Sequence, residues 1–130
     1  RDAEITAKYN DDKYCNYLFT VSGYRDLFRM LEAVSREEWA PTVPTDLPIL
    51  LISGEDDPVG SYGKGVCAVA GALAHAGAQK LKTVLIPGAR HEVLNETDRA
   101  DTYTLIDGWI GEVLDELPFE EVVTFSEGEI

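Results

Sequence analysis

The chain has 130 residues and a mass of 14.3 kDa, which is the size of one domain. It carries 24 Asp and Glu against 11 Lys and Arg, so its formal net charge is −13. This charge excludes binding to nucleic acid through phosphates, and docking on an anionic membrane by charge, because both need a basic face. Apolar residues make up 45% and charged residues 27% of the chain, which is ordinary for a globular protein and argues against general disorder.

The two cysteines, Cys15 and Cys67, lie far apart and show no CxxC spacing. Two cysteines are too few for a disulfide scaffold, so we interpret them as reduced thiols and expect a cytoplasmic protein.

The longest apolar stretches, 47–52 and 66–76, are shorter than the ~20 residues that span a bilayer, so we expect no transmembrane segment. The first residues also lack the pattern of a signal peptide. The chain starts at Arg1, and its one methionine is Met30. We therefore expect either a processed product or part of something longer.

The first third of the chain changes pattern at Tyr24. Residues 1–20 are polar and aromatic without a period, which predicts an extended loop lying on a surface. Apolar residues at steps of three and four then predict a helix with one apolar face: Tyr24, Leu27, Phe28, Leu31 and Val34. Ser35 and Glu38 have the spacing of a capping box, which predicts a short second helix through Trp39.

Strand and helix patterns alternate from about residue 47. The apolar run 49–52 follows three prolines and predicts a strand buried on both faces. A helical stripe follows and ends at Gly77, where a C-terminal glycine cap belongs; it consists of Tyr62, Val66, Val69, Ala70 and Leu73. Residues 81–86 predict a second strand.

The last predicted helix begins after the polar residues 95–98, which can cap it, and ends at Pro118. Its residues expected to face inward are Tyr103, Ile106, Ile110, Val113 and Leu117. Residues 101–130 contain no Lys or Arg, so we interpret the end of the chain, 119–130, as a solvated acidic tail.

The order strand, helix, strand, helix is typical of a parallel α/β sheet with crossover helices. A sheet of only two parallel strands is not stable by itself, because apolar strands need neighbours on both sides. We therefore predict an α/β fold that is incomplete by itself: a segment of a larger sheet, or a chain that completes its sheet by association with itself or a partner.

The loops after the two predicted strands hold the candidate chemistry, since ligands and catalytic residues gather beyond the carboxyl ends of parallel strands. The first loop contains Asp57 and the second contains His91. A carboxylate that accepts from one ring nitrogen leaves the other free to act as a general base. The alternative stays open that Asp57 caps the following helix and that His91 packs in a turn.

Other motifs are weaker. Residues 63–68 match GxGxxA but start too far from the strand for a nucleotide site. His91 begins an HExxH pattern whose second ligand position is Asn95, so we expect no zinc. The acidic run 55–57 lacks the spacing of a calcium loop. Cys67 falls on the apolar side of its predicted helix and is interpreted as a core residue. We expect no metal and no cofactor.

Two loops carry the motifs Gly54-Glu-Asp-Asp57-Pro-Val-Gly and Pro87-Gly-Ala-Arg-His91-Glu-Val-Leu-Asn-Glu96, with Tyr62-Gly-Lys-Gly-Val66 between them. Together these segments resemble the last third of α/β-hydrolases of the monoacylglycerol lipase and lysophospholipase type. The resemblance covers roughly residues 8–117. It implies that Asp57 is the acid and His91 the base of a catalytic triad. It also implies a remnant of the cap region in residues 1–46 and the hydrolase core in residues 47–118.

The resemblance implies a serine hydrolase that cleaves lipid esters, with Phe19, Tyr24, Phe28 and Trp39 lining the acyl pocket. Glu92 and Glu96 either tether the histidine loop or cap the last helix. The family's GxSxG nucleophile motif is missing from the chain. We therefore expect the isolated chain to be inactive, with the missing N-terminal half of the hydrolase, or a second copy, as its partner. The alternative is a non-catalytic module that acts through association.

Overall fold

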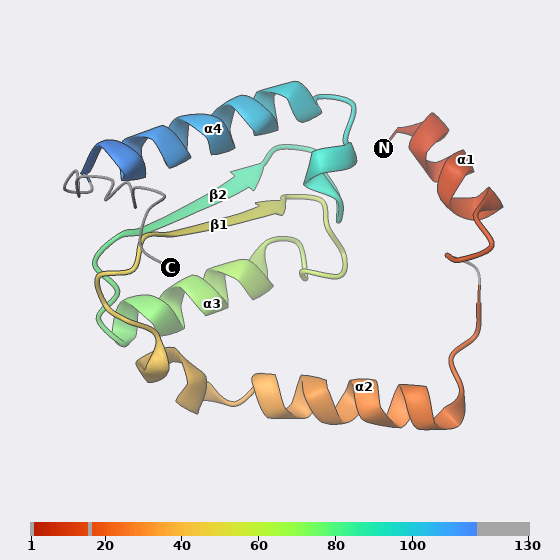
Figure 1. Cartoon of the computed structure of the whole chain (residues 1–130), viewed down its shortest axis with the longest axis horizontal. Coiled ribbons are helices and arrows are strands. Elements are labelled where there is room, and N and C mark those ends of the chain that lie inside the picture. Colours follow the sequence, from red (N-terminus) through yellow and green to blue (C-terminus); the bar gives the residue numbers. More distant parts are fainter. Residues whose placement is uncertain (1, 16, 117–130) are drawn as a thin grey trace, which may run out of the picture.

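Two parallel strands lie between two helices that cover opposite faces of the sheet (Figure 1). Strand β1 (Ile49–Gly54) pairs with β2 (Leu81–Ile86) in a register that runs from Ile49↔Leu81 to Gly54↔Ile86. Helix α3 (Lys64–His75) connects the strands, and α4 (Arg99–Glu116) follows β2. This computed structural model describes residues 2–15 and 17–116. It confirms the expected strand and helix order of an incomplete α/β fold.

Helix α3 packs on the sheet, and its Leu73 is 3% exposed. The helix ends as expected, because Gly77 adopts a left-handed φ of 98° and the Ala78 N–H donates to the Leu73 carbonyl at 3.0 Å. Its start differs from the expectation. Tyr62 lies outside the helix, in a turn with a φ of 56°, and does not extend the apolar stripe.

The expected extended loop at residues 1–20 is wrong for its first half, which forms α1 (Ala3–Asp11). The side chain of Asp2 caps this helix by accepting from the N–H groups of Glu4 and Ile5, at 2.9 and 3.2 Å. Arg99, at the start of α4, also donates to Asp2 at 3.2 Å. Local capping and this distant ion pair stabilise a helix whose apolar pattern is weak.

Helix α2 (Val21–Val34) forms where the periodicity predicts it, but its apolar face is uncovered. Tyr24, Phe28 and Leu31 are 43%, 63% and 48% exposed. Figure 1 shows α3 between this helix and the sheet. No element in the described part of the chain covers the apolar face of α2. The amphipathic pattern of α2 therefore predicts that this face packs against a neighbour that does not belong to the described residues.

The expected short helix through Trp39 forms, but the capping box at Ser35 is wrong. The segment is a 3-10 helix, η1 (Glu37–Thr42), whose N-cap is Arg36 and which has no side-chain cap bond. Pro41 lies inside it and has no N–H to donate, which favours a short, tight turn over an α-helix.

Helix α4 follows a short 3-10 turn, η2 (Val93–Asn95). The expected inward face is only partly correct: Ile106 and Val113 are half-buried, whereas Tyr103 and Ile110 are 49% and 44% exposed. The expected inward Leu117 and the acidic tail, 119–130, lie outside the described residues.

The described residues form a small core. Within 2–15 and 17–116, the nearly fully buried apolar side chains are Ala40, Leu73 and Ala89. Many large apolar side chains, including Leu94 and Leu114, are exposed instead. This openness fits a sheet that lacks neighbouring strands, because those neighbours would cover the exposed side chains. In the same part of the chain, no helix is both long and apolar enough to cross a membrane.

Candidate active site

The loops after β1 and β2 are bound to each other at the carboxyl ends of the strands. The Glu55 N–H donates to the Ile86 carbonyl at 3.0 Å, and the Asp56 N–H donates to the Ala89 carbonyl at 2.9 Å. Gly54 permits this approach, since a Cβ there would lie 2.3 Å from the carbonyl oxygens of Ala89 and Arg90. The two loops therefore act as one platform.

Asp57 is fixed by its own loop. Its Oδ1 accepts from the Val59 N–H at 2.9 Å, and its Oδ2 accepts from the Gly60 N–H at 3.2 Å. The residue is 4% exposed. An Asp followed by Pro, Val and Gly has the signature of a turn in which the carboxylate binds backbone N–H groups, a signal that could have predicted both donors.

His91 contacts Asp57 across the two loops. Its Nδ1 lies 3.1 Å from Asp57 Oδ2, while its side chain is 64% exposed. An ionised carboxylate only accepts hydrogen bonds, so Nδ1 carries the proton in a neutral ring and Nε2 is unprotonated. The structure thus brings together the two residues that sequence reasoning selected, in the arrangement that prepares a histidine as a general base.

Opposing effects act on the ionisation of Asp57. Burial raises the pKa of this carboxyl group, but hydrogen bonds from His91, Val59 and Gly60 together outweigh burial and hold the pKa below its ordinary value of 3.8. The carboxylate is therefore ionised at neutral pH and stabilises a positive charge on His91.

Asp57 is not the cap of the following helix. Helix α3 has Gly63 as its N-cap, and Ser61, Tyr62 and Gly63 all adopt left-handed φ values, of 54°, 56° and 79°. A Cβ at Gly63 would lie 2.9 Å from Leu85 of β2. The sequence did not predict these three consecutive left-handed residues, because only the glycine among them is a residue type that favours positive φ.

The two glutamates after His91 have different roles. Glu96 is 2% exposed, and its Oε1 accepts from the Arg90 N–H at 2.7 Å. Glu92 is exposed, and its Oε2 accepts from Asn95 at 2.8 Å. Of the two roles left open by the sequence, the geometry therefore gives Glu96 the tether of the histidine loop.

Three of the four expected acyl-pocket residues form an aromatic row. The rings of Phe19 and Tyr24 meet edge to face at 5.3 Å between centroids, and Tyr24 stacks on Phe28 at 6.3 Å. Tyr17 extends the row through an edge contact with Phe19 at 5.4 Å. Trp39 lies in η1 and does not join the row.

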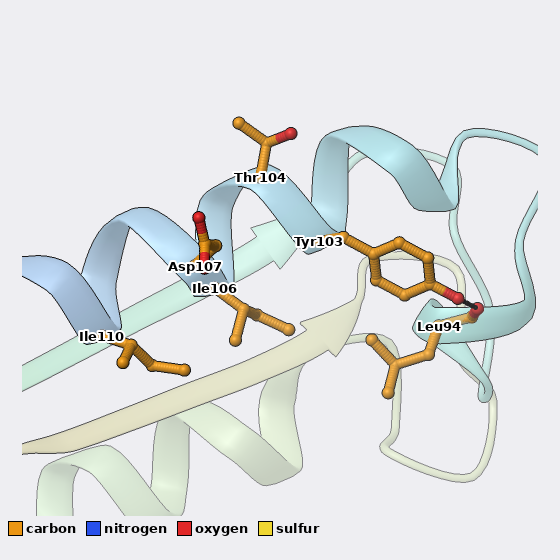
Figure 2. Close-up of a pocket in the computed structure, with 6 residues that line it drawn as sticks. All are labelled: Leu94, Tyr103, Thr104, Ile106, Asp107 and Ile110. Carbon is orange, nitrogen blue, oxygen red and sulfur yellow. Dashed lines mark hydrogen bonds between the residues drawn. The ribbon is translucent and has the colours of Figure 1, made fainter.

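An open apolar hollow of about 550 Å³ runs along α4 beside η2 (Figure 2). It is lined by Leu94, Tyr103, Thr104, Ile106, Asp107 and Ile110. In Figure 2 the apolar side chains point to one side of α4, and Tyr103 Oη donates to the Leu94 carbonyl at 2.8 Å. Tyr103 and Ile110 are exposed because nothing in the described chain covers this hollow.

Cys15 and Cys67 are both unpaired and exposed, so the interpretation of Cys67 as a core residue is wrong for this chain. Across the described ranges, no three His, Cys, Asp or Glu side chains are grouped to hold a metal ion.

Comparisons with known proteins identify the family of this fold. A family described as "Serine aminopeptidase, S33" matches residues 1–98. A thermostable carboxyl esterase from Bacillus coagulans, solved with glycerol, is 36% identical with a TM-score of 0.70, over 88% of this chain and 36% of that one. A lipase in its open form is 30% identical with a TM-score of 0.74, over 86% of this chain and 36% of that one.

The chain therefore spans about a third of the length of these two solved structures. A search of curated proteins found no match. The family match covers well over half of the chain, and the fold is that of an incomplete α/β-hydrolase. The chain belongs to the S33 serine aminopeptidase family of α/β-hydrolases.

Proposed function

We propose that this chain supplies the acid and the base of a serine hydrolase that cleaves lipid esters of the lysophospholipase or monoacylglycerol type. The observation that carries the proposal is the 3.1 Å contact between buried Asp57 and exposed His91 at the carboxyl ends of neighbouring strands. The esterase and the lipase that resemble the chain support the same reaction class.

In this mechanism His91 acts through Nε2. It takes the proton of a serine hydroxyl as the serine oxygen attacks the ester carbonyl, and it later returns that proton to the leaving alcohol. Asp57 holds the Nδ1 proton and stabilises the imidazolium formed between these steps. Water then attacks the acyl-enzyme with His91 again as the base, which releases the fatty acid and restores the serine.

The nucleophile must come from another segment. The serines of the chain are Ser22, Ser35, Ser53, Ser61 and Ser126, and none lies in a GxSxG motif. A triad works as a unit, so an acid and base alone give little turnover. The 130-residue chain is therefore inactive by itself and acts when joined to, or associated with, a segment that carries the serine and the oxyanion donors.

The aromatic row on and before α2 supports an acyl substrate. Its rings, from Tyr17 to Phe28, offer a continuous apolar surface that a hydrocarbon chain can cover. Trp39 is assigned to the same pocket on sequence resemblance alone.

The test uses the complete product of the gene that encodes this chain. It should hydrolyse 1-acylglycerol and p-nitrophenyl esters and react with a fluorophosphonate probe, whereas the 130-residue chain should do neither. His91→Ala in the complete protein should abolish turnover, and Asp56→Asn should not, since Asp56 is an exposed neighbour of Asp57. A complete product without a reactive serine, or an active His91→Ala variant, would contradict the proposal.

The second candidate is a non-catalytic module that acts by association. The small core and the exposed apolar residues of α2 and α4 favour it, because such surfaces are typical of interfaces. Each strand also has one unpaired edge in the two-stranded sheet. Sedimentation of the 130-residue chain distinguishes the candidates: a stable homodimer favours the module, and a monomer that binds the serine-bearing segment favours the hydrolase.

A further inference from the structure

We infer that Glu96 is a positioning residue that holds the histidine loop so that His91 meets Asp57. This inference deepens the proposed function and rests on it for the catalytic consequence. Its structural part concerns the chain alone, because it predicts which ring nitrogen of His91 carries the proton.

The His91 ring has little support of its own. The His91 side chain is 64% exposed, and the bond that fixes it is the 3.1 Å contact with Asp57 Oδ2. A ring with so little packing takes its position from its backbone. The geometry of the pair therefore depends on what fixes the backbone just before His91, at residues 89 and 90.

Glu96 fixes the peptide between Ala89 and Arg90, to which the Arg90 N–H belongs. Its Oε1 accepts from the Arg90 N–H at 2.7 Å, across a loop of six residues. On the other side, the Ala89 carbonyl of the same peptide accepts from the Asp56 N–H at 2.9 Å. This peptide is thus held at its N–H by the Glu96 side chain and at its carbonyl by the loop after β1.

Glu96 is itself buried and anchored by hydrogen bonds. It is 2% exposed although it is a glutamate, and burial of such a group is costly unless its oxygens are hydrogen-bonded. Its own carbonyl accepts from the N–H of Arg99 at 3.2 Å and from the Arg99 side chain at 3.3 Å, which anchors it to the start of α4. Glu96 therefore connects the start of α4 to the loop that carries His91.

The test measures the His91 tautomer by two-bond ¹H–¹⁵N correlation in the full 130-residue chain labelled on histidine. Wild type and Glu96→Gln should show the Nδ1–H form, because glutamine keeps an acceptor oxygen in place. Glu96→Ala should shift the ring toward the Nε2–H form that is favoured in free histidine. Glu92→Ala is the matched control, an exposed glutamate of the same loop, and should leave the tautomer unchanged.

Activity in the complete protein gives the second readout. Glu96→Ala should lower kcat by about 100-fold with KM nearly unchanged, since misplacement of a catalytic group by about 1 Å has this effect. Glu96→Gln should restore most of kcat. If Glu96→Ala fails to fold, Glu96→Asp, which shortens the side chain by one methylene, replaces it and should show the same tautomer shift.

The inference is overturned if a folded Glu96→Ala or Glu96→Asp chain keeps the wild-type tautomer. It is also overturned if Glu96→Gln behaves like Glu96→Ala in both readouts. Failure of the proposed function is a separate result: the complete protein then hydrolyses no ester and binds no fluorophosphonate, while the tautomer measurement still decides the role of Glu96.

Discussion

The loops at the strand ends and the N-terminal helices are stabilised in different ways. Around Asp57 and His91, backbone groups from both loops are hydrogen-bonded to each other, and Asp57, Ala89 and Glu96 are at most 4% exposed. Helices α1 and α2 contain no buried residue. Their ends are capped by Asp2 and Thr20, but their apolar side chains face outward.

This difference separates what the chain fixes by itself from what it needs another segment to fix. The strand-end loops need only β1, β2 and the start of α4, all of which are present. The apolar face of α2 needs a neighbour, because amphipathic periodicity is stabilising only when the apolar side is buried. The acid–base geometry is therefore local, whereas the surface proposed for the acyl chain depends on the rest of a hydrolase.

The largest expected effect comes from removing the carboxylate of Asp57, at the centre of the strand-end loops. Asp57→Asn in the complete protein should lower kcat by roughly 10³- to 10⁴-fold, because an amide at this position no longer holds the ring in the Nδ1–H form. Initial rates of p-nitrophenyl ester hydrolysis measure the change. Asp56→Asn removes the same charge one residue away and should alter kcat less than about twofold. Equal losses in the two variants would assign the effect to net charge and not to the hydrogen bond.

A second substitution attacks the contact between the two loops. Gly54→Ala places a Cβ 2.3 Å from two backbone carbonyl oxygens that cannot move freely, so it should destabilise the complete protein by about 3 kcal/mol or more. Urea unfolding followed by circular dichroism measures this change. Gly71→Ala on α3 is the control, because a Cβ there meets nothing within 4 Å. A Gly54→Ala variant as stable as the control would show that the loops do not touch as described.

Substitutions of two helical leucines compare the stability of the two regions directly. Leu73 of α3 is 3% exposed, and Leu31 of α2 is 48% exposed. In the 130-residue chain Leu73→Ala should cost about 2–5 kcal/mol of unfolding free energy, whereas Leu31→Ala should change it by less than about 0.5 kcal/mol. Urea midpoints of the two variants test this. A large loss from Leu31→Ala in the isolated chain would mean that α2 is already covered, for example by a second copy.

The sequence predicted the regions that follow simple periodicity and local turn signals. Strand 81–86 and the glycine end at Gly77 were correct, because an apolar run and a left-handed glycine are local properties. Helix α1 was missed, since its stability comes from the Asp2 cap and the distant Arg99, and not from an apolar stripe. The exposure of the apolar face of α2 and of Tyr103 and Ile110 could not be predicted either, because periodicity marks an apolar face but does not show whether another element covers it.

The site shows the same division between local and distant information. The pairing of Asp57 with His91 follows from their places after neighbouring parallel strands, which a sequence reveals. From the sequence, Glu96 could either tether the histidine loop or cap the last helix. A glutamate near the start of a helix has the same sequence pattern in either role. Only the direction of its side chain distinguishes them.

The smallest expected effect concerns pH, because Asp57 is one carboxyl group among 24 acidic residues. Its pKa in the folded chain lies below the ordinary value of 3.8, so the unfolded chain binds this proton more readily as the pH falls. The stabilisation is therefore complete above the ordinary pKa and disappears as the pH falls through the lower folded pKa. The difference in urea midpoint between wild type and Asp57→Asn should shrink as the pH falls below about 4. A difference that widens in acid would mean that burial, and not hydrogen bonding, controls the ionisation of Asp57.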